Sequence, residues 1–95
     1  MRQYELTVVL SPQSKTDKLD QVIKQIEDLI TKVSGKITES EDWGEKHLSY
    51  KIKSHDSGLF RHFVLDLNPQ AIAELEGKLK LIKGVLRLLL VKKEK

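Results

Sequence analysis

The sequence contains no cysteine, two prolines and five aromatic residues among its 95 positions. Without cysteine the chain forms no disulfide and has neither a thiolate nucleophile nor a cysteine-based zinc site, a composition compatible with a reducing cytosol. No apolar run approaches the roughly 18 residues that a membrane-spanning helix needs, and no signal peptide is visible before the first alternating segment. We therefore expect a soluble cytoplasmic protein with no membrane partner.

Residues that could carry catalysis are also scarce. The histidines His47, His55 and His62 lack the spacing of metal ligands and do not converge with a carboxylate cluster. No glycine-rich phosphate-binding loop opens either helical segment, since these segments begin after Ser-Pro-Gln-Ser and Asn-Pro. The sequence therefore predicts no enzyme, no metal site, no cofactor and no small-molecule substrate.

Charge is distributed unevenly along the chain. The net charge is +3, but residues 77–95 hold seven basic residues and one acid, a local charge of +6. Clustered cations attract phosphate backbones, although a solvated lysine-rich helix and tail would have the same composition. A chain of this length forms one domain, which we expect to span residues 1–95 with a flexible basic tail at 92–95.

Hydrophobic periodicity predicts six elements. Alternation indicates strands, and apolar residues at three- and four-residue steps indicate helices. Gly35 is expected to end the first helix in a left-handed conformation, Asn68 to cap the second and Gly84 to end it. The predicted elements are a strand ending at residue 10, a helix over 17–34, a strand over 36–53 bent at Gly44, a loop over 54–58, a strand over 59–67, a helix from 68 to 84 and a strand over 85–91.

This order predicts an α+β fold, the ferredoxin-like split βαβ plan written βαββαβ. In that plan two helices cover one face of a four-stranded antiparallel sheet. Because the crossovers are right-handed, we place the first and third strands at the centre and the second and fourth at the edges.

The most informative stretch runs from Trp43 to Ile52. After Gly44, which is typical of a bulge, the apolar residues Leu48, Tyr50 and Ile52 alternate with polar, mostly cationic ones. Trp43 is either a half-buried aromatic that covers the end of the sheet or a contact for a partner. An edge strand with charged side chains resists self-pairing and attracts phosphate. The residues thus indicate a module that binds RNA, a protein or both.

The sequence resembles the bacterial small-subunit ribosomal protein S6 family. The resemblance rests on residues 1–5 and on the Trp43 to Ile52 stretch followed by Gly58 and Phe60, and it extends from Met1 to about Lys92. It implies a ferredoxin-like fold and a structural, non-catalytic role on the ribosome. It also implies binding of the 16S ribosomal RNA central domain, on the platform of the small subunit, as a heterodimer with ribosomal protein S18.

The resemblance also suggests which residues make contacts. Arg2 and Tyr4 match the family's N-terminal motif, Lys46 and His47 its basic pair, and Tyr50 its signature tyrosine. With the charged edge and basic end, the predicted RNA contacts are Arg2, Lys46, His47, Lys53, Arg87, Lys92 and Lys93. The predicted protein-partner contacts are Tyr4, Trp43, Gly44, Tyr50 and Lys51. The alternative is a non-ribosomal ferredoxin-like module for protein interaction or ligand binding.

Overall fold

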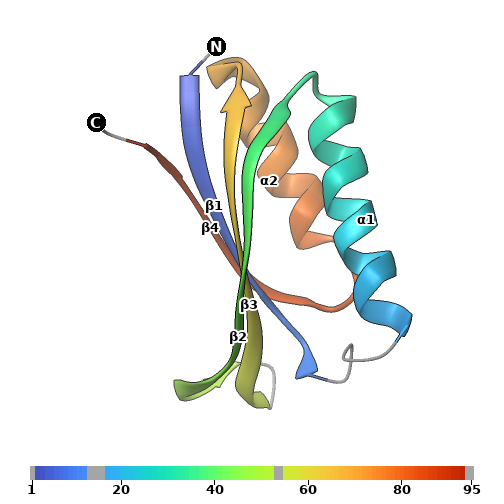
Figure 1. Ribbon diagram of the computed structural model, residues 1–95, viewed down its shortest axis with the longest axis vertical. Helices are drawn as coiled ribbons and strands as arrows, with labels where there is room; N and C mark the ends of the chain where they lie inside the picture. The colour runs from blue at the N-terminus through green and yellow to red at the C-terminus, as the bar shows by residue number, and fades with distance from the viewer. Residues whose placement is uncertain (1, 13–16, 53–54, 94–95) are drawn as a thin grey trace.

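The structure, a computed structural model, describes residues 2–12, 17–52 and 55–93. None of the helices it describes is long and apolar enough to cross a bilayer. Figure 1 shows the elements in chain order: β1 (Arg2–Leu10), α1 (Asp17–Lys32), β2 (Lys36–Ile52), β3 (His55–Leu67), the 3₁₀ helix η2 (Pro69–Ala71), α2 (Ile72–Lys80) and β4 (Val85–Lys92).

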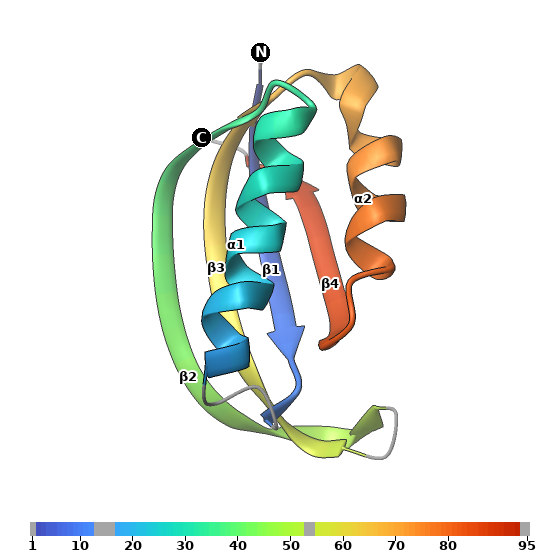
Figure 2. The ribbon, with the colours of Figure 1, turned by 90° about the vertical axis from the view of Figure 1, so that its right-hand side faces the viewer.

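The four strands form one antiparallel sheet in the order β2-β3-β1-β4. Both helices lie on the same face of the sheet, and the opposite face is left open (Figures 1 and 2). The ferredoxin-like fold and the placement of β1 and β3 at the centre are therefore confirmed. The two edges belong to β2 and β4.

The core lies between the helices and the sheet. On β1, Leu6, Val8 and Leu10 are fully buried, as the alternating pattern predicted. Burying a side chain of this size stabilises the fold by roughly 1.5 to 3 kcal/mol. The other fully buried hydrophobic side chains come from α1, β3 and α2: Ile26, Ile30, Phe63, Leu65, Leu67, Leu75 and Leu79.

The end of α1 differs from the prediction. Ser34, rather than Gly35, adopts the left-handed conformation, with φ of 65°. Its N–H donates to the Thr31 carbonyl at 2.9 Å, and the Gly35 N–H donates to the Ile30 carbonyl at 2.8 Å, which is the Schellman pattern. Gly35 is required because a Cβ there would lie 3.0 Å from the Ile30 carbonyl oxygen and from a Leu67 methyl. Gly35 was expected to adopt the left-handed conformation, but its role is to let the backbone pack closely against Ile30 and Leu67.

The start of the second helical segment agrees with the prediction. The Asn68 side chain accepts a hydrogen bond from the Gln70 N–H at 3.0 Å. Pro69 opens η2, and α2 follows from Ile72. The predicted end of this helix at Gly84 is wrong, because α2 ends at Lys80. Gly84, with φ of 102°, makes the turn into β4. β4 extends to Lys92, so Lys92 belongs to the sheet and not to the tail predicted over 92–95. Residues 94 and 95 lie outside the described part.

The predicted loop over 54–58 is wrong for the residues that the structure describes. β3 begins at His55, and its first residues pair with the far half of β2: Lys46 with Gly58 and His47 with Ser57. The polar composition suggested a loop, but a long partner strand supplies the backbone hydrogen bonds that favour extended structure. Figure 2 shows the resulting β2–β3 hairpin curving beyond the other strands.

Two irregularities bend β2. The register with β3 shifts at Thr38, whose hydroxyl donates to the Val64 carbonyl at 3.1 Å, and again between Asp42 and Gly44. Gly44 has φ of 78°, which confirms the predicted bulge. The extra residue at the second shift is Trp43, so the bulge sets the position of this side chain.

Candidate functional site

The Trp43 side chain lies on the open face of the sheet. Its ring stacks on the imidazole of His62, with the centroids 4.5 Å apart and the planes at 8°. Its Nε1 donates to Glu41 Oε2 at 2.7 Å, and the side chain remains 39% exposed. The Trp43 ring therefore covers the neighbouring strand β3 and still presents aromatic surface to solvent, and its contact with a partner stays a prediction.

His62 is held by two residues of β1. Its Nδ1 lies 2.9 Å from the Thr7 hydroxyl oxygen, and its Nε2 lies 3.5 Å from Glu5 Oε1. Thr7 is the residue directly opposite His62 in the β1–β3 register. These contacts fix the plane of the imidazole, and the stacked Trp43 ring is fixed with it.

Lys46 belongs to the same surface. Its ammonium nitrogen lies 5.4 Å from the centroid of the Trp43 ring and 5.7 Å from that of Phe60. A cation over an aromatic face contributes about 0.5 to 1 kcal/mol at an exposed position. We call Trp43, Lys46, Phe60 and His62 the tryptophan patch. Phe60 and His62 were not predicted as site residues, because only the cross-strand register brings them beside Trp43.

Carboxylates border the tryptophan patch. β2 carries two exposed acids on the same face as Trp43, Glu39 and Glu41, and Glu5 approaches His62 from β1. Two further exposed acids of β2 lie on the opposite face, where Asp42 forms an ion pair with Arg61 at 3.5 Å and Glu45 accepts a hydrogen bond from the Ser57 hydroxyl at 3.1 Å.

A second surface lies where the two ends of the described chain meet. The Lys93 N–H donates to the Gln3 carbonyl at 3.0 Å, and Lys92 pairs with Tyr4. Arg2 precedes Gln3 in the chain, so the backbones of Arg2, Lys92 and Lys93 lie at one corner of the sheet, which we call the cationic corner. This is the corner where β1 begins and β4 ends (Figure 1).

The two surfaces lie at opposite ends of the sheet. Phe60 of the tryptophan patch pairs with Val9, whereas Arg2 lies seven residues away at the other end of β1. At 3.3 Å per residue, this separation is about 23 Å. Lys46 and His47, two of the predicted RNA contacts, therefore lie far from Arg2, Lys92 and Lys93.

The remaining predicted site residues are dispersed. Tyr4 lies in the core, with 5% of its surface exposed, and Arg87 is an exposed residue of β4. Gly44 is at the bulge beside Trp43. Tyr50 and Lys51 belong to β2, but their side chains, like the whole of Lys53, lie outside the described part. Within that part, no group of three or more acidic or histidine side chains is arranged to hold a metal ion.

Comparison with known families decides among the functions that this geometry allows. The model of the family described as ribosomal protein S6 matches residues 3–92. The chain belongs to the ribosomal protein S6 family. Membership in the S6 family makes it a structural, non-enzymatic protein of the small ribosomal subunit, located on the ribosome in the cytoplasm.

S6 proteins of individual bacteria match nearly the whole of this chain. Small ribosomal subunit protein bS6 of Geobacter sulfurreducens is 35% identical, over 100% of this chain and 81% of the relative. That of Fusobacterium nucleatum is 29% identical, over 99% of this chain and 100% of the relative.

Solved structures show the same fold. The crystal structure of 30S ribosomal protein S6 from Thermotoga maritima has a TM-score of 0.89 at 20% identity, over 97% of this chain and 87% of that one. The C-terminal domain of the MgtC protein from Mycobacterium tuberculosis shares the fold more distantly, with a TM-score of 0.65 at 17% identity, over 99% of this chain and 89% of that one. The fold therefore occurs outside the S6 family, and the family assignment rests on sequence.

Proposed function

We propose that this S6 protein binds the central domain of 16S ribosomal RNA together with ribosomal protein S18, as a heterodimer on the platform of the small subunit. The observation that carries this proposal is the separation of two exposed surfaces of different chemistry. The cationic corner is suited to RNA, and the acid-bordered tryptophan patch is suited to a protein.

The cationic corner has the features that a phosphate backbone requires. Arg2 and Lys92 are exposed, and Lys93 is half-exposed. The hydrogen bond from the Lys93 N–H to the Gln3 carbonyl holds the two strand ends together, so the backbones that carry the three cations are held side by side. Each cation that neutralises a phosphate releases a counterion, which makes the affinity depend on salt.

The tryptophan patch suits a protein with basic side chains. An exposed aromatic ring at the centre and a polar rim are typical of the residues that contribute most to a protein interface. Trp43 occupies such a position, and the neighbouring β2 acids would attract arginine or lysine of the partner. A phosphate near Lys46 or His47 would have to approach those carboxylates, which disfavours RNA at this end.

A binding experiment with the partner tests the proposal. The chain would be titrated with a central-domain 16S ribosomal RNA fragment, with and without S18, at two salt concentrations. We expect RNA binding only in the presence of S18, with an affinity that falls as salt rises. Tight, salt-insensitive binding by the lone chain, or no binding with S18 present, would contradict the proposal.

Two variants separate the surfaces. Replacing Arg2, Lys92 and Lys93 by alanine should weaken RNA binding by the pair and leave the affinity for S18 unchanged, whereas Trp43→Ala should weaken S18 binding measured without RNA. Lys24→Ala, on the exposed side of α1, is the matched control and should change neither. If the triple variant lost S18 binding, or if Trp43→Ala lost none, this division of surfaces would be wrong.

A further inference from the structure

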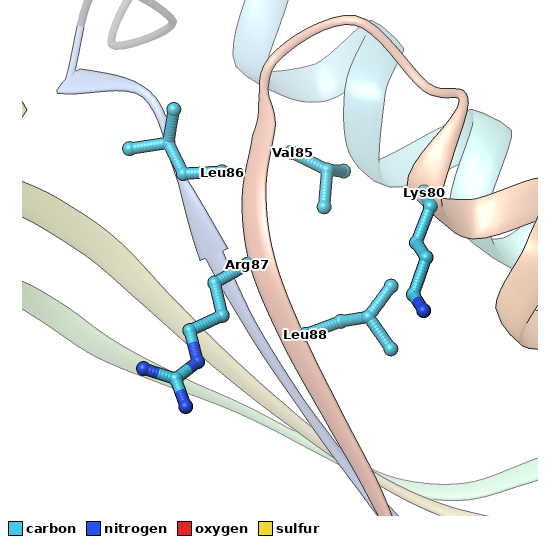
Figure 3. A pocket seen from close by; sticks show the side chains of 5 residues that line it. All are labelled: Lys80, Val85, Leu86, Arg87 and Leu88. Carbon is cyan, nitrogen blue, oxygen red and sulfur yellow. The ribbon is translucent and has the colours of Figure 1, made fainter. Parts of the chain in front are cut away.

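The free edge of β4 is a third surface, distinct from the tryptophan patch. A cavity of about 320 Å³ lies along this edge and is lined by Lys80 from the end of α2 and by residues of the strand itself. Figure 3 shows Lys80 and Leu88 on one side of the β4 ribbon, with Leu86 and Arg87 on the other. We call this cavity and the neighbouring strand edge the β4 trough.

The register shows which backbone groups of β4 remain available. The Lys93 N–H donates to the Gln3 carbonyl, so this opposed pair is hydrogen-bonded. Hydrogen-bonded pairs alternate along an antiparallel ladder, which directs the N–H and C=O groups of Leu89 and Val91 toward β1. The corresponding groups of Leu88, Leu90 and Lys92 point to the free edge, where they form a template for another strand.

Exposed apolar side chains continue the β4 trough. Leu89 is 58% exposed and Val91 is 41% exposed, and both lie beyond Arg87 on the open face of the sheet. A free backbone edge beside exposed aliphatic side chains is the surface that polypeptides use when they bind by strand addition.

The charge of the β4 trough is of one sign. Residues 79–93 contain five cations and no acid. In the part of the chain that the structure describes, neither Lys80 nor Arg87 forms an ion pair, whereas Lys78 is paired with Glu74 at 3.1 Å. The β4 trough therefore complements an acidic segment.

We propose that the β4 trough binds an extended acidic segment of another protein, which adds a strand to the edge of the sheet. Successive side chains of a strand point to opposite faces, so two consecutive acidic residues would reach Lys80 on the helix side and Arg87 on the open side. Apolar residues farther along the segment would cover Leu89 and Val91. This partner is additional to the RNA and S18 of the proposed function.

Other occupants fit less well. A second copy of the chain paired through its own β4 would bring two sets of cations together, which opposes association. RNA would use Lys80 and Arg87, but it would leave the backbone ladder unpaired and the exposed Leu89 and Val91 without an apolar partner. The combination of charge, apolar surface and free backbone favours a polypeptide.

The test uses three synthetic eight-residue peptides with blocked ends. The first has two adjacent glutamates followed by alternating valine and threonine, the second has the reverse order, and the third has lysines in place of the glutamates. Amide chemical shifts of the full chain would be followed by NMR during titration. We expect one of the two acidic peptides to bind and to shift the amides of Leu88, Leu90 and Lys92 most, with weaker binding as salt rises.

Variants test the charges and the backbone separately. Lys80→Glu with Arg87→Glu should weaken binding of the acidic peptide at least about tenfold at low salt and should allow the lysine peptide to bind. The control Lys24→Glu should change neither. Lys92→Pro, which removes an N–H from the free edge, should bind more weakly than Lys92→Ala, which keeps it.

Three results would overturn the proposal. The acidic peptide could shift amides outside β4 instead of those in it, its affinity could be unaffected by the double charge reversal, or Lys92→Pro and Lys92→Ala could bind it with equal affinity. If the central-domain RNA fragment shifted the same amides and neither acidic peptide did, the β4 trough would be an RNA surface instead.

Discussion

Ser34 and Gly35 divide between them two tasks that one glycine often performs at the end of a helix. Ser34 takes the left-handed conformation, and Gly35 allows the chain to pass against Ile30 and Leu67. A residue with a Cβ in the left-handed region costs roughly 1 kcal/mol, so the strain at Ser34 is a local weakness of an otherwise well-packed α1.

Exchanges at these two positions should have opposite effects. Ser34→Gly should raise the free energy of unfolding by about 0.5 to 1 kcal/mol, because glycine relieves the strained φ. Gly35→Ala should lower it, because a Cβ at 3.0 Å from the Ile30 carbonyl oxygen forces a backbone adjustment. Urea unfolding followed by circular dichroism measures both changes. If both exchanges changed the free energy of unfolding in the same direction, the roles assigned to Ser34 and Gly35 would be wrong.

Gly58 should tolerate a side chain least of the glycines in the sheet. A Cβ at Gly58 would lie 2.3 Å from Cγ1 of Val9, so Gly58→Ala should destabilise the chain by about 1 to 3 kcal/mol. Gly77, inside α2, is the matched control, since nothing lies within 4 Å of its added Cβ and alanine is the better helix former. Thermal unfolding should show a lower Tm for Gly58→Ala and an equal or higher Tm for Gly77→Ala.

A second substitution checks the cause of the Gly58 effect. Val9→Ala in the Gly58→Ala background should recover part of the lost stability, because it removes the methyl that clashes. If the double variant were less stable than Gly58→Ala by the full cost of Val9→Ala alone, steric overlap would not be the reason.

His62 should control the exposure of Trp43. His62→Ala removes the ring on which the indole stacks, so the fluorescence of this single tryptophan should shift to longer wavelength and become more accessible to acrylamide. Thr7→Val, which removes the hydroxyl beside Nδ1 but leaves the imidazole, should have the smaller effect. An unchanged emission spectrum in His62→Ala would show that the bulge alone positions Trp43.

The cations of the cationic corner should act additively on the salt dependence. In the complex with S18, each of Arg2→Ala and Lys92→Ala should reduce the slope of log K against log salt by about 0.7 to 0.9, the value expected for one lost phosphate contact. Affinity measurements at four salt concentrations would give these slopes. A lower affinity with an unchanged slope would indicate that the residue acts without contacting phosphate.

The sequence predicts the elements with strong periodicity well. The alternation in β1 and the helical stripe in α1 bury the expected residues, because in both elements packing and pattern agree. The strand over residues 55–58 was missed because its composition is that of a loop, and only pairing with the long β2 makes it extended. At Ser34 a tertiary constraint, the approach of Gly35 to Leu67, overrides the local preference for glycine.

The candidate site was predictable in part. Trp43, Gly44 and Lys46 are found together because they are neighbours in sequence, whereas His62 and Phe60 join them only through the β2–β3 register. In the same way, the meeting of Arg2 with Lys92 depends on the pairing of β1 with β4, which no local pattern contains. The β4 trough depends on that pairing as well, since it determines which edge of the strand stays free.

The hydrogen bond between the Lys93 N–H and the Gln3 carbonyl links the second residue of β1 to the residue that follows β4. Ribosomes synthesise proteins from the N-terminus, so Arg2 emerges long before Lys92 and Lys93. The cationic corner is therefore complete only after β4 has been synthesised and has paired with β1. A growing chain that still lacks β4 would have only part of the surface that we propose for RNA binding. Recruitment to RNA through this surface would therefore favour molecules whose synthesis and folding are finished.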